Sequence, residues 1–249
     1  MRTTFAHKMY YSIRGAFAMG PACGLKLALA LFAGRNVRLR PRGYPHPFLL
    51  RGRDSDTQIA TAVFAKEEYA TPGKDSVDLI LDLGANIGYS AIYFAAHYPK
   101  AKVVAVEPAE ANYLALCANT KPYANIVPLQ LGVWWREARV KIDNPGADSW
   151  AFHFSECGEG GVESTTVGEL VRIHRGTGRV MVKMDIEGAE REIFQHGVDW
   201  IADIDHLQIE IHHCFKEVFE ALSSYPYSAY ISGENVVMDF TAGRKEPGA

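Results

Sequence analysis

Two hydrophobic runs in the second half of the chain stop at residues that can exchange protons. One run is followed by Asp185 and Glu187, and the other ends in Glu210 and His212. Side chains two residues apart on a strand share a face, so Glu210 and His212 are expected to lie together. A carboxylate or an imidazole can remove a hydroxyl proton during a reaction. We therefore predict Asp185 or His212 as a catalytic base, with Glu187 orienting the substrate or supporting the loop.

The sequence does not decide whether Asp185 and a neighbouring carboxylate bind a metal ion. Asp185 and another carboxylate offer the oxygen ligands that a divalent cation prefers. A three-ligand site at His212, His213 and Cys214 is not expected, because consecutive strand residues point to opposite faces. The four cysteines are scattered without paired spacing, which predicts neither a disulfide framework nor a structural zinc site.

Lys183 has two interpretations. It shares a strand face with Asp185, and Asp82 ends another hydrophobic run. If these strands are neighbours, both residues and Asp82 join Glu210 and His212 in one polar row. Charged groups are too costly to bury unpaired. An ion-pair network with Lys183 bridging carboxylates is therefore the structural alternative to a functional role for Lys183 and Glu210.

A glycine-bearing turn joins the hydrophobic run 79–83 to a helical pattern at 89–97. Glycine allows close backbone approach to a ligand, and the helix N-terminus favours an anionic group such as a pyrophosphate or a carboxylate. The dinucleotide fingerprint needs glycines where this chain has Asn86 and Tyr89, which disfavours NAD. The candidate cofactor residues of this turn are Asp82, Gly84, Asn86 and Gly88.

An acid stands about 20 residues beyond the turn, where it can accept both ribose hydroxyls of an adenosyl group. This acid is Glu107, at the end of the run 103–106 and before Pro108. The alternative is a helix cap without ligand contact. We predict Glu107 as a cofactor-binding residue.

Short hydrophobic runs alternate with helical patterns, which is typical of βαβ units around a parallel sheet. The strands expected from these runs are 79–83, 103–106, 126–131, 180–184 and 207–211. A β-hairpin insertion is expected at 139–142 and 150–154, and an antiparallel pair at 227–231 and 236–240. Ser55 and Gln58 have capping-box spacing before a helix at 56–65. The predicted fold is a doubly wound α/β domain with a mostly parallel seven-stranded sheet and a helical lead-in.

The start of the chain differs in charge from the rest. Residues 1–53 hold ten Lys or Arg and no Asp or Glu, which leaves 16 basic and 29 acidic residues in the remainder. We divide the chain into a basic, helical arm at 1–44 and a catalytic domain at 45–249. The arm suits an anionic membrane surface, an acidic partner or a phosphorylated substrate, although basic tails are commonly only solvated.

An apolar stretch at 15–34 carries Lys26, Pro21 and four glycines, which disfavours a membrane-spanning helix. A packing or amphipathic helix is expected there, with a cleaved signal or transit leader as the alternative. The cysteine pattern makes a cytoplasmic location the default expectation.

The motifs together resemble the FkbM family of class I, Rossmann-like methyltransferases. The resemblance rests on the segment 82–88, on Glu107 with Pro108, on Lys183 to Glu190 and on Glu210 to His212, and covers about residues 45–213. It implies S-adenosylmethionine as cofactor, S-adenosylhomocysteine as product, and O-methylation of a small molecule, saccharide or natural product.

Three alternatives remain beside this expectation. A cofactor-binding accessory protein without turnover is one, since fold alone does not establish activity. A metal-dependent O-methyltransferase is the second. Methylation of nucleic acid bases is disfavoured, because residues 185–188 replace the Asn/Asp-Pro-Pro-aromatic segment of such enzymes and the chain after residue 53 is acidic.

Overall fold

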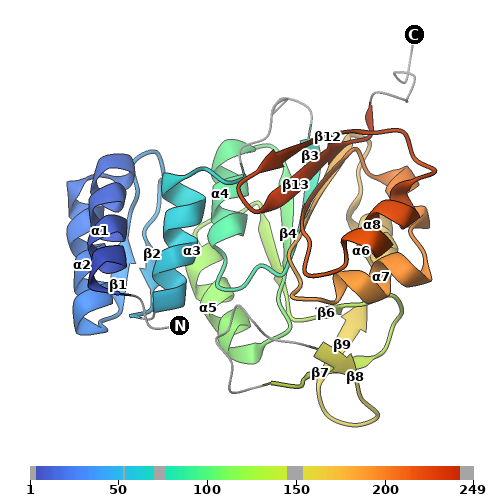
Figure 1. Cartoon of the computed structure of the whole chain (residues 1–249), viewed down its shortest axis with the longest axis horizontal. Helices are drawn as coiled ribbons and strands as arrows, with labels where there is room; N and C mark the ends of the chain where they lie inside the picture. The colour runs from blue at the N-terminus through green and yellow to red at the C-terminus, as the bar shows by residue number, and fades with distance from the viewer. Residues whose placement is uncertain (1–3, 53, 70–76, 145–153, 242–249) are drawn as a thin grey trace.

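The computed structural model describes residues 4–52, 54–69, 77–144 and 154–241, and a seven-stranded sheet runs through its centre (Figure 1). The strands stand in the order β12-β13-β11-β10-β3-β4-β5. Their bounds are β3 Val77–Leu83, β4 Lys102–Val106, β5 Ile126–Leu129, β10 Arg179–Met184, β11 His206–Glu210, β12 Ser228–Ser232 and β13 Asn235–Asp239. Neighbouring strands from β5 to β11 are parallel, and β13 and β12 add an antiparallel edge. The predicted doubly wound, mostly parallel sheet is confirmed.

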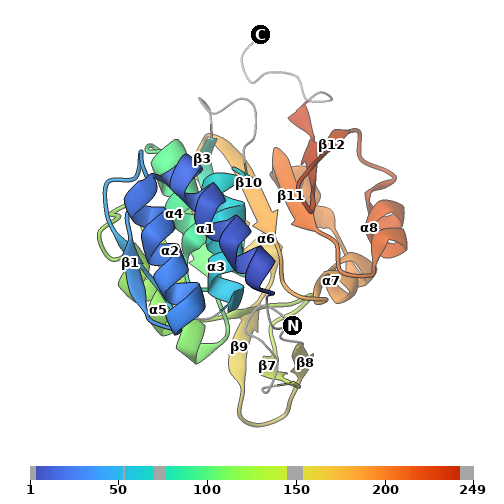
Figure 2. The same ribbon diagram turned by 60° about the vertical axis from the view of Figure 1, so that its left-hand side comes forward.

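Helices cover both faces of this sheet (Figures 1 and 2). Their bounds are α4 Tyr89–His97, α5 Glu110–Thr120, α6 Val167–His174, α7 Glu190–His196, a 3₁₀ helix η2 at Asp199–Asp203 and α8 Phe215–Leu222. Alternation along β3 sends Ile80 into a core with Phe94 of α4, while Leu81 enters the opposite core with Leu170 of α6. The central strand β3 is thus buried on both sides, as its continuous hydrophobic run requires.

A small second sheet lies beside the carboxyl edge of the main one. Its strands are β6 Gly132–Val133, β7 Arg139–Ile142, β8 Phe154–Glu156 and β9 Val162–Thr165, in the order β6-β9-β7-β8. The predicted hairpin is present, since β7 pairs antiparallel with β8. Its second strand runs from 154 to 156 and so includes the polar Ser155 and Glu156, which carry no hydrophobic signal. Residues 145–153, with most of the predicted strand 150–154, lie outside the described residues.

The N-terminal part contains α1 Phe5–Met19, α2 Pro21–Ala33, β1 Val37–Leu39, β2 Phe48–Leu50 and α3 Asp54–Ala65. Instead of one helix over 15–34, the chain forms two, because Pro21 starts a new helix after Gly20. Helix α3 begins at Asp54, so the prediction that Ser55 caps it is wrong. Strand β1 lies before residue 44 and β2 after it, so their pairing connects the predicted arm at 1–44 with the predicted domain at 45–249. The division of the chain at residue 44 stays a prediction.

None of the helices in the described ranges is long and apolar enough to span a lipid bilayer.

Gly84 shows why the turn after β3 needs a glycine. Its φ of +78° lies in the left-handed region, and a Cβ placed on it would stand 1.8 Å from the carbonyl oxygen of Asp185. The neighbouring strand β10 therefore approaches the turn too closely for any side chain. This contact brings the ends of β3 and β10 together.

We expect Gly84→Ala to destabilise the protein by at least about 3 kcal/mol, because strain at positive φ adds to a backbone clash. Chemical denaturation measures this change. Gly158→Ala is the matched control, since an added Cβ there has nothing within 4 Å. Equal unfolding free energies for the two variants would contradict this account of the turn.

Candidate active site

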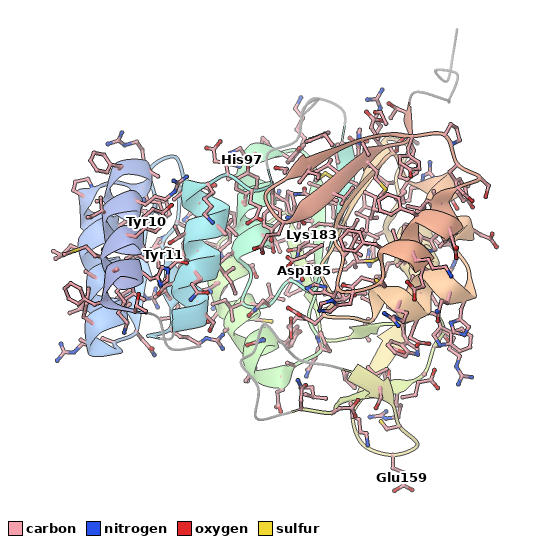
Figure 3. All side chains as sticks on the ribbon, viewed as in Figure 1. Tyr10, Tyr11, His97, Glu159, Lys183 and Asp185 are labelled. Atoms are coloured by element: carbon pink, nitrogen blue, oxygen red, sulfur yellow. The ribbon has the colours of Figure 1, made fainter. Side chains whose placement is uncertain are left out.

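A cavity of about 780 Å³ opens at the carboxyl ends of the parallel strands. Open α/β sheets bind their ligands at this edge. Its walls come from the loops after β3, β4, β10 and β11, from α3, from the turn between β12 and β13, and from Tyr11 of α1. Figure 3 shows Lys183 and Asp185 close together in the middle of the molecule and Tyr11 on the side of α1 toward α3.

The glycine turn forms one wall through its backbone. The amides of Gly84 and Ala85 both donate to the carbonyl of Val106, at 3.0 and 2.9 Å, which ties the turn to β4. Gly84 and Asn86 line the cavity, as predicted for cofactor-binding residues, but that role stays a prediction. The side-chain oxygen of Asn86 is buried and has no hydrogen-bond partner among the described residues.

Asp82 and Gly88 occupy different positions from those expected. Neither belongs to the described residues that line the cavity. Asp82 is fully buried behind it and accepts a hydrogen bond of 2.6 Å from Ser90 Oγ. Gly88 has a φ of +94° at the start of α4. Both residues are placed to support the turn, and their predicted role in cofactor binding stays a prediction.

Glu107 lines the cavity next to the turn. Its Oε2 accepts from the amide of Asn86 and its Oε1 from the amide of Ala109, both at 2.9 Å. These donors fix both carboxylate oxygens and leave each with further acceptor capacity. Burial raises the pKa of Glu107 to about 7, partly opposed by the backbone donors. The hydrogen bond from the Ala109 amide and a ligand-binding role are therefore compatible at this residue.

Lys183 is the buried cation of the site. Its ammonium lies 3.5 Å from Asp82 on β3 and 3.5 Å from Asp185, and it donates to the carbonyl of Gly84 at 3.1 Å. The ring of Tyr69 stands 5.7 Å away. Burial alone lowers the pKa of Lys183, but the Tyr69 hydroxyl and the two carboxylates raise it overall, so the group stays charged. This is the bridging network that the sequence offered as the structural alternative.

His212 is surrounded by carboxylates. Its Nδ1 lies 3.1 Å from the fully buried Glu190, while its Nε2 lies 3.4 Å from Glu210 and 3.6 Å from Glu187. Burial lowers the pKa of His212, but the contacts with Glu190 and Glu210 outweigh it and raise the pKa to about 11. Both ring nitrogens are thus engaged, which argues against His212 as the base.

Glu187 and Asp185 complete this corner of the cavity. Burial, followed by the nearby Asp185, raises the pKa of Glu187 to about 8. Ligand atoms of Asp185, Glu187 and His212 all lie within 4.8 Å of one another, a spacing that a metal ion can bridge. All three predicted catalytic residues therefore meet at one place.

Several residues of the site were not among the predicted ones, and three of them contact the predicted network or reach the cavity from far away in the sequence. Glu190 accepts the amides of Ile186 and Gly188 and anchors His212, although its only sequence signal is its place in the acidic motif. Tyr69 follows α3 and reaches Lys183 from a segment that the sequence marked only as lead-in. Tyr11 had no signal in the sequence, because its helix, Phe5–Met19, lies far before the turn at Gly84 along the chain and lines the same cavity only in the fold.

Comparison with known proteins assigns a family. The family model described as methyltransferase FkbM domain matches residues 82–229, more than half of the chain. The hexuronic acid methyltransferase AglP of Haloferax volcanii is 27% identical over 173 residues, which is 68% of this chain and 71% of the relative. The methyltransferase sdnD of Sordaria araneosa is 27% identical over 180 residues, 57% of this chain and 68% of the relative.

Among solved structures, the FkbM methyltransferase of Methylobacillus flagellatus aligns with a TM-score of 0.46 and 14% identity. The alignment covers 95% of this chain but 58% of that one, so this chain spans less than two thirds of the solved protein.

Glu190→Gln tests the charge of His212. Replacing the buried carboxylate with an amide removes the strongest support of the imidazolium, so we expect the pKa of His212 to fall from about 11 by more than about one unit. Titration of the imidazole signals by NMR measures it. Glu192→Gln, which lies on the same helix beside His196, should leave His212 unchanged. An unaltered His212 titration in Glu190→Gln would contradict the assigned network.

The extent of the family match over the segments that form the cavity leads to one conclusion: the chain belongs to the FkbM family of methyltransferases.

Proposed function

We propose that this chain transfers a methyl group from S-adenosylmethionine to a hydroxyl oxygen of a saccharide or a related natural product. The observation that carries the proposal is that one cavity brings Glu107, the glycine turn and Asp185 together. The relatives support the acceptor class, since one is named for a hexuronic acid.

The cavity fits this cofactor in size, charge and polar groups. A volume of about 780 Å³ lies within the roughly 300 to 1,000 Å³ common for small-molecule sites and leaves room for an acceptor. The buried, unpartnered Asn86 oxygen suits a polar ligand. Carboxylates outnumber cations along the walls, which favours a ligand that carries positive charge.

The residues of the turn and Glu107 would hold the cofactor. S-adenosylmethionine, when bound, supplies an electrophilic methyl carbon on a sulfonium. Glu107 would accept hydrogen bonds from the ribose hydroxyls, and the N-terminus of α4 with Asn86 would bind the amino acid end. Lys183 acts indirectly, since it neutralises Asp82 and Asp185 and fixes the turn through the Gly84 carbonyl.

Asp185 is the base that the geometry favours. It lines the cavity and is held by Lys183 alone among the described ion pairs, whereas both nitrogens of His212 face carboxylates. Asp185 accepts the proton of the acceptor hydroxyl, and the imidazolium of His212 with Glu187 positions the acceptor. Polar side chains of Ser55 and Gln58 on the outer wall suit hydrogen bonding to a sugar.

A metal-dependent reaction is the second candidate. The cluster of Asp185, Glu187 and His212 has the spacing for a cation, which would lower the pKa of an acceptor hydroxyl. A cytoplasmic location stays a prediction.

Glu107 should make cofactor binding depend on pH. Its raised pKa of about 7 means that the carboxyl is largely protonated below neutral pH, and the ribose hydroxyls need the ionised form. We expect the affinity for S-adenosylhomocysteine to rise about tenfold between about pH 6 and pH 8. Isothermal titration calorimetry measures it. Glu107→Gln should bind weakly with no such pH trend; wild-type affinity in this variant would refute the ribose contact.

The rate of turnover should show whether Asp185 is the catalytic base. We expect Asp185→Asn to lower the rate of S-adenosylhomocysteine formation about 10² to 10⁴-fold on a hydroxylated saccharide acceptor, with little change in cofactor affinity. Asp199→Asn, at an exposed position of η2, is the matched control. A rate within threefold of wild type in Asp185→Asn would contradict its role as base.

Chelation distinguishes the two candidate mechanisms. We expect full activity in EDTA if Asp185 is the base. Activity lost in EDTA and restored by Mg²⁺ would instead favour the metal-dependent reaction, while absence of turnover on every acceptor with intact cofactor binding would favour an accessory protein.

A further inference from the structure

The N-terminal hairpin of α1 and α2 gathers most of the exposed apolar surface. Eight of the fourteen large hydrophobic side chains that are exposed among the described residues belong to these two helices. On α1 they include Phe5, Met9, Ile13 and Phe17, and on α2 they are Leu25, Leu29 and Phe32. Positions three and four apart share a helix face, so each helix carries one continuous apolar stripe.

The opposite faces of the two helices lock the hairpin in place. A Cβ on Gly24 would stand 2.4 Å from the Cβ of Ala16, and one on Gly15 would stand 2.2 Å from Leu27. Leu27 is fully buried. Small residues thus bring α1 and α2 together and fix which faces point outward, so the exposed stripes follow from packing.

The two stripes join into one surface. The rings of Phe5 and Phe32 lie 5.5 Å apart, which connects the start of α1 to the end of α2. The ammonium of Lys8 stands 5.9 Å from the Phe32 ring. Figures 1 and 2 agree that the hairpin forms one end of the molecule, beyond α3.

Positive charge accompanies this apolar surface. The first 53 residues contain ten Lys or Arg and no acid. Lys26 on α2 is exposed, and Arg35, Arg38 and Arg40 follow at exposed positions. Large isolated apolar patches on a soluble surface indicate an interaction site, and apolar residues with cationic neighbours are typical of helices that lie in the headgroup region of a membrane.

We propose that the outer face of the α1–α2 hairpin docks on a membrane surface containing anionic lipid. Helices of 15 and 13 residues reach roughly 22 and 20 Å, short of a bilayer core of about 30 Å, so the hairpin lies along the surface. A second copy fits poorly, because two acid-free hairpins repel each other. The inner side of α1 carries Tyr11 into the cavity wall, so docking brings that wall near the lipid.

Cosedimentation with vesicles tests this proposal. We compare phosphatidylcholine vesicles with vesicles that also contain phosphatidylglycerol, using the full chain. The wild-type protein should bind the anionic vesicles at least about fivefold better. The double variant Phe17→Ser and Leu25→Ser should bind the anionic vesicles at least about tenfold more weakly, because two apolar side chains that contact the lipid are replaced by polar ones.

Ile231→Ser is the matched control, since Ile231 is 78% exposed on β12 and Phe17 is 86% exposed. Thermal unfolding, measured without cofactor, checks that both variants are folded. Absence of binding to anionic vesicles, or an equal loss in Ile231→Ser, overturns the proposal. A second outcome would also overturn it. If the wild-type protein is a dimer in light scattering and does not bind vesicles, and the variant with Phe17→Ser and Leu25→Ser is a monomer, the face joins two copies of the chain instead.

Discussion

The buried ammonium of Lys183 is the interaction on which the site depends. It lies between Asp82 on β3 and Asp185 at the end of β10, and it donates to the carbonyl of Gly84. The Asp82 carboxylate, which is fully buried, would be too costly at this depth without a cation. The sheet order makes the arrangement possible, because β3 and β10 are neighbours with Lys183 paired in register with Asp82. The carbonyl of Gly84 and the carboxylate of Asp185 are therefore both held by this one group.

A second anchor, Glu190, fixes the other side of the cavity. It accepts the amides of Ile186 and Gly188 and contacts His212, so one buried carboxylate shapes the loop after β10 and holds the histidine. The two anchors stabilise opposite charges. Lys183 stabilises negative charge near the turn, and Glu190 stabilises positive charge at His212. Asp185 lies between them at the cavity wall, which is where a base must act on an acceptor.

The sequence predicted the features that depend on local pattern. Continuous hydrophobic runs marked the parallel strands, and the polar residues at their ends marked the edge where the cavity lies, because both follow from strand alternation. Roles that depend on distant partners were harder to assign. The motif predicts Asp82 as a cofactor-binding residue, but its contacts with Ser90 and Lys183 could not be predicted from the motif, because both partners come from other elements. His212 reads as a base until three carboxylates surround it in the fold.

The N-terminal helices show the same limit. Gly20 and Pro21 divide one apolar stretch into two helices, and only their packing reveals which face remains exposed and that Tyr11 reaches the cavity. Exposure and long-range contact are properties of the assembled chain, so composition reports the charge of this segment but not its orientation.

In the proposed mechanism, one cavity holds the cofactor on Glu107 and directs its reactive end to Asp185. A crystal structure with bound S-adenosylhomocysteine tests this most directly. The account predicts ribose hydroxyls on the Glu107 carboxylate, the amino acid end at the turn around Asn86, and the sulfur facing Asp185. An adenosyl group bound elsewhere, or a sulfur directed away from Asp185, would contradict it.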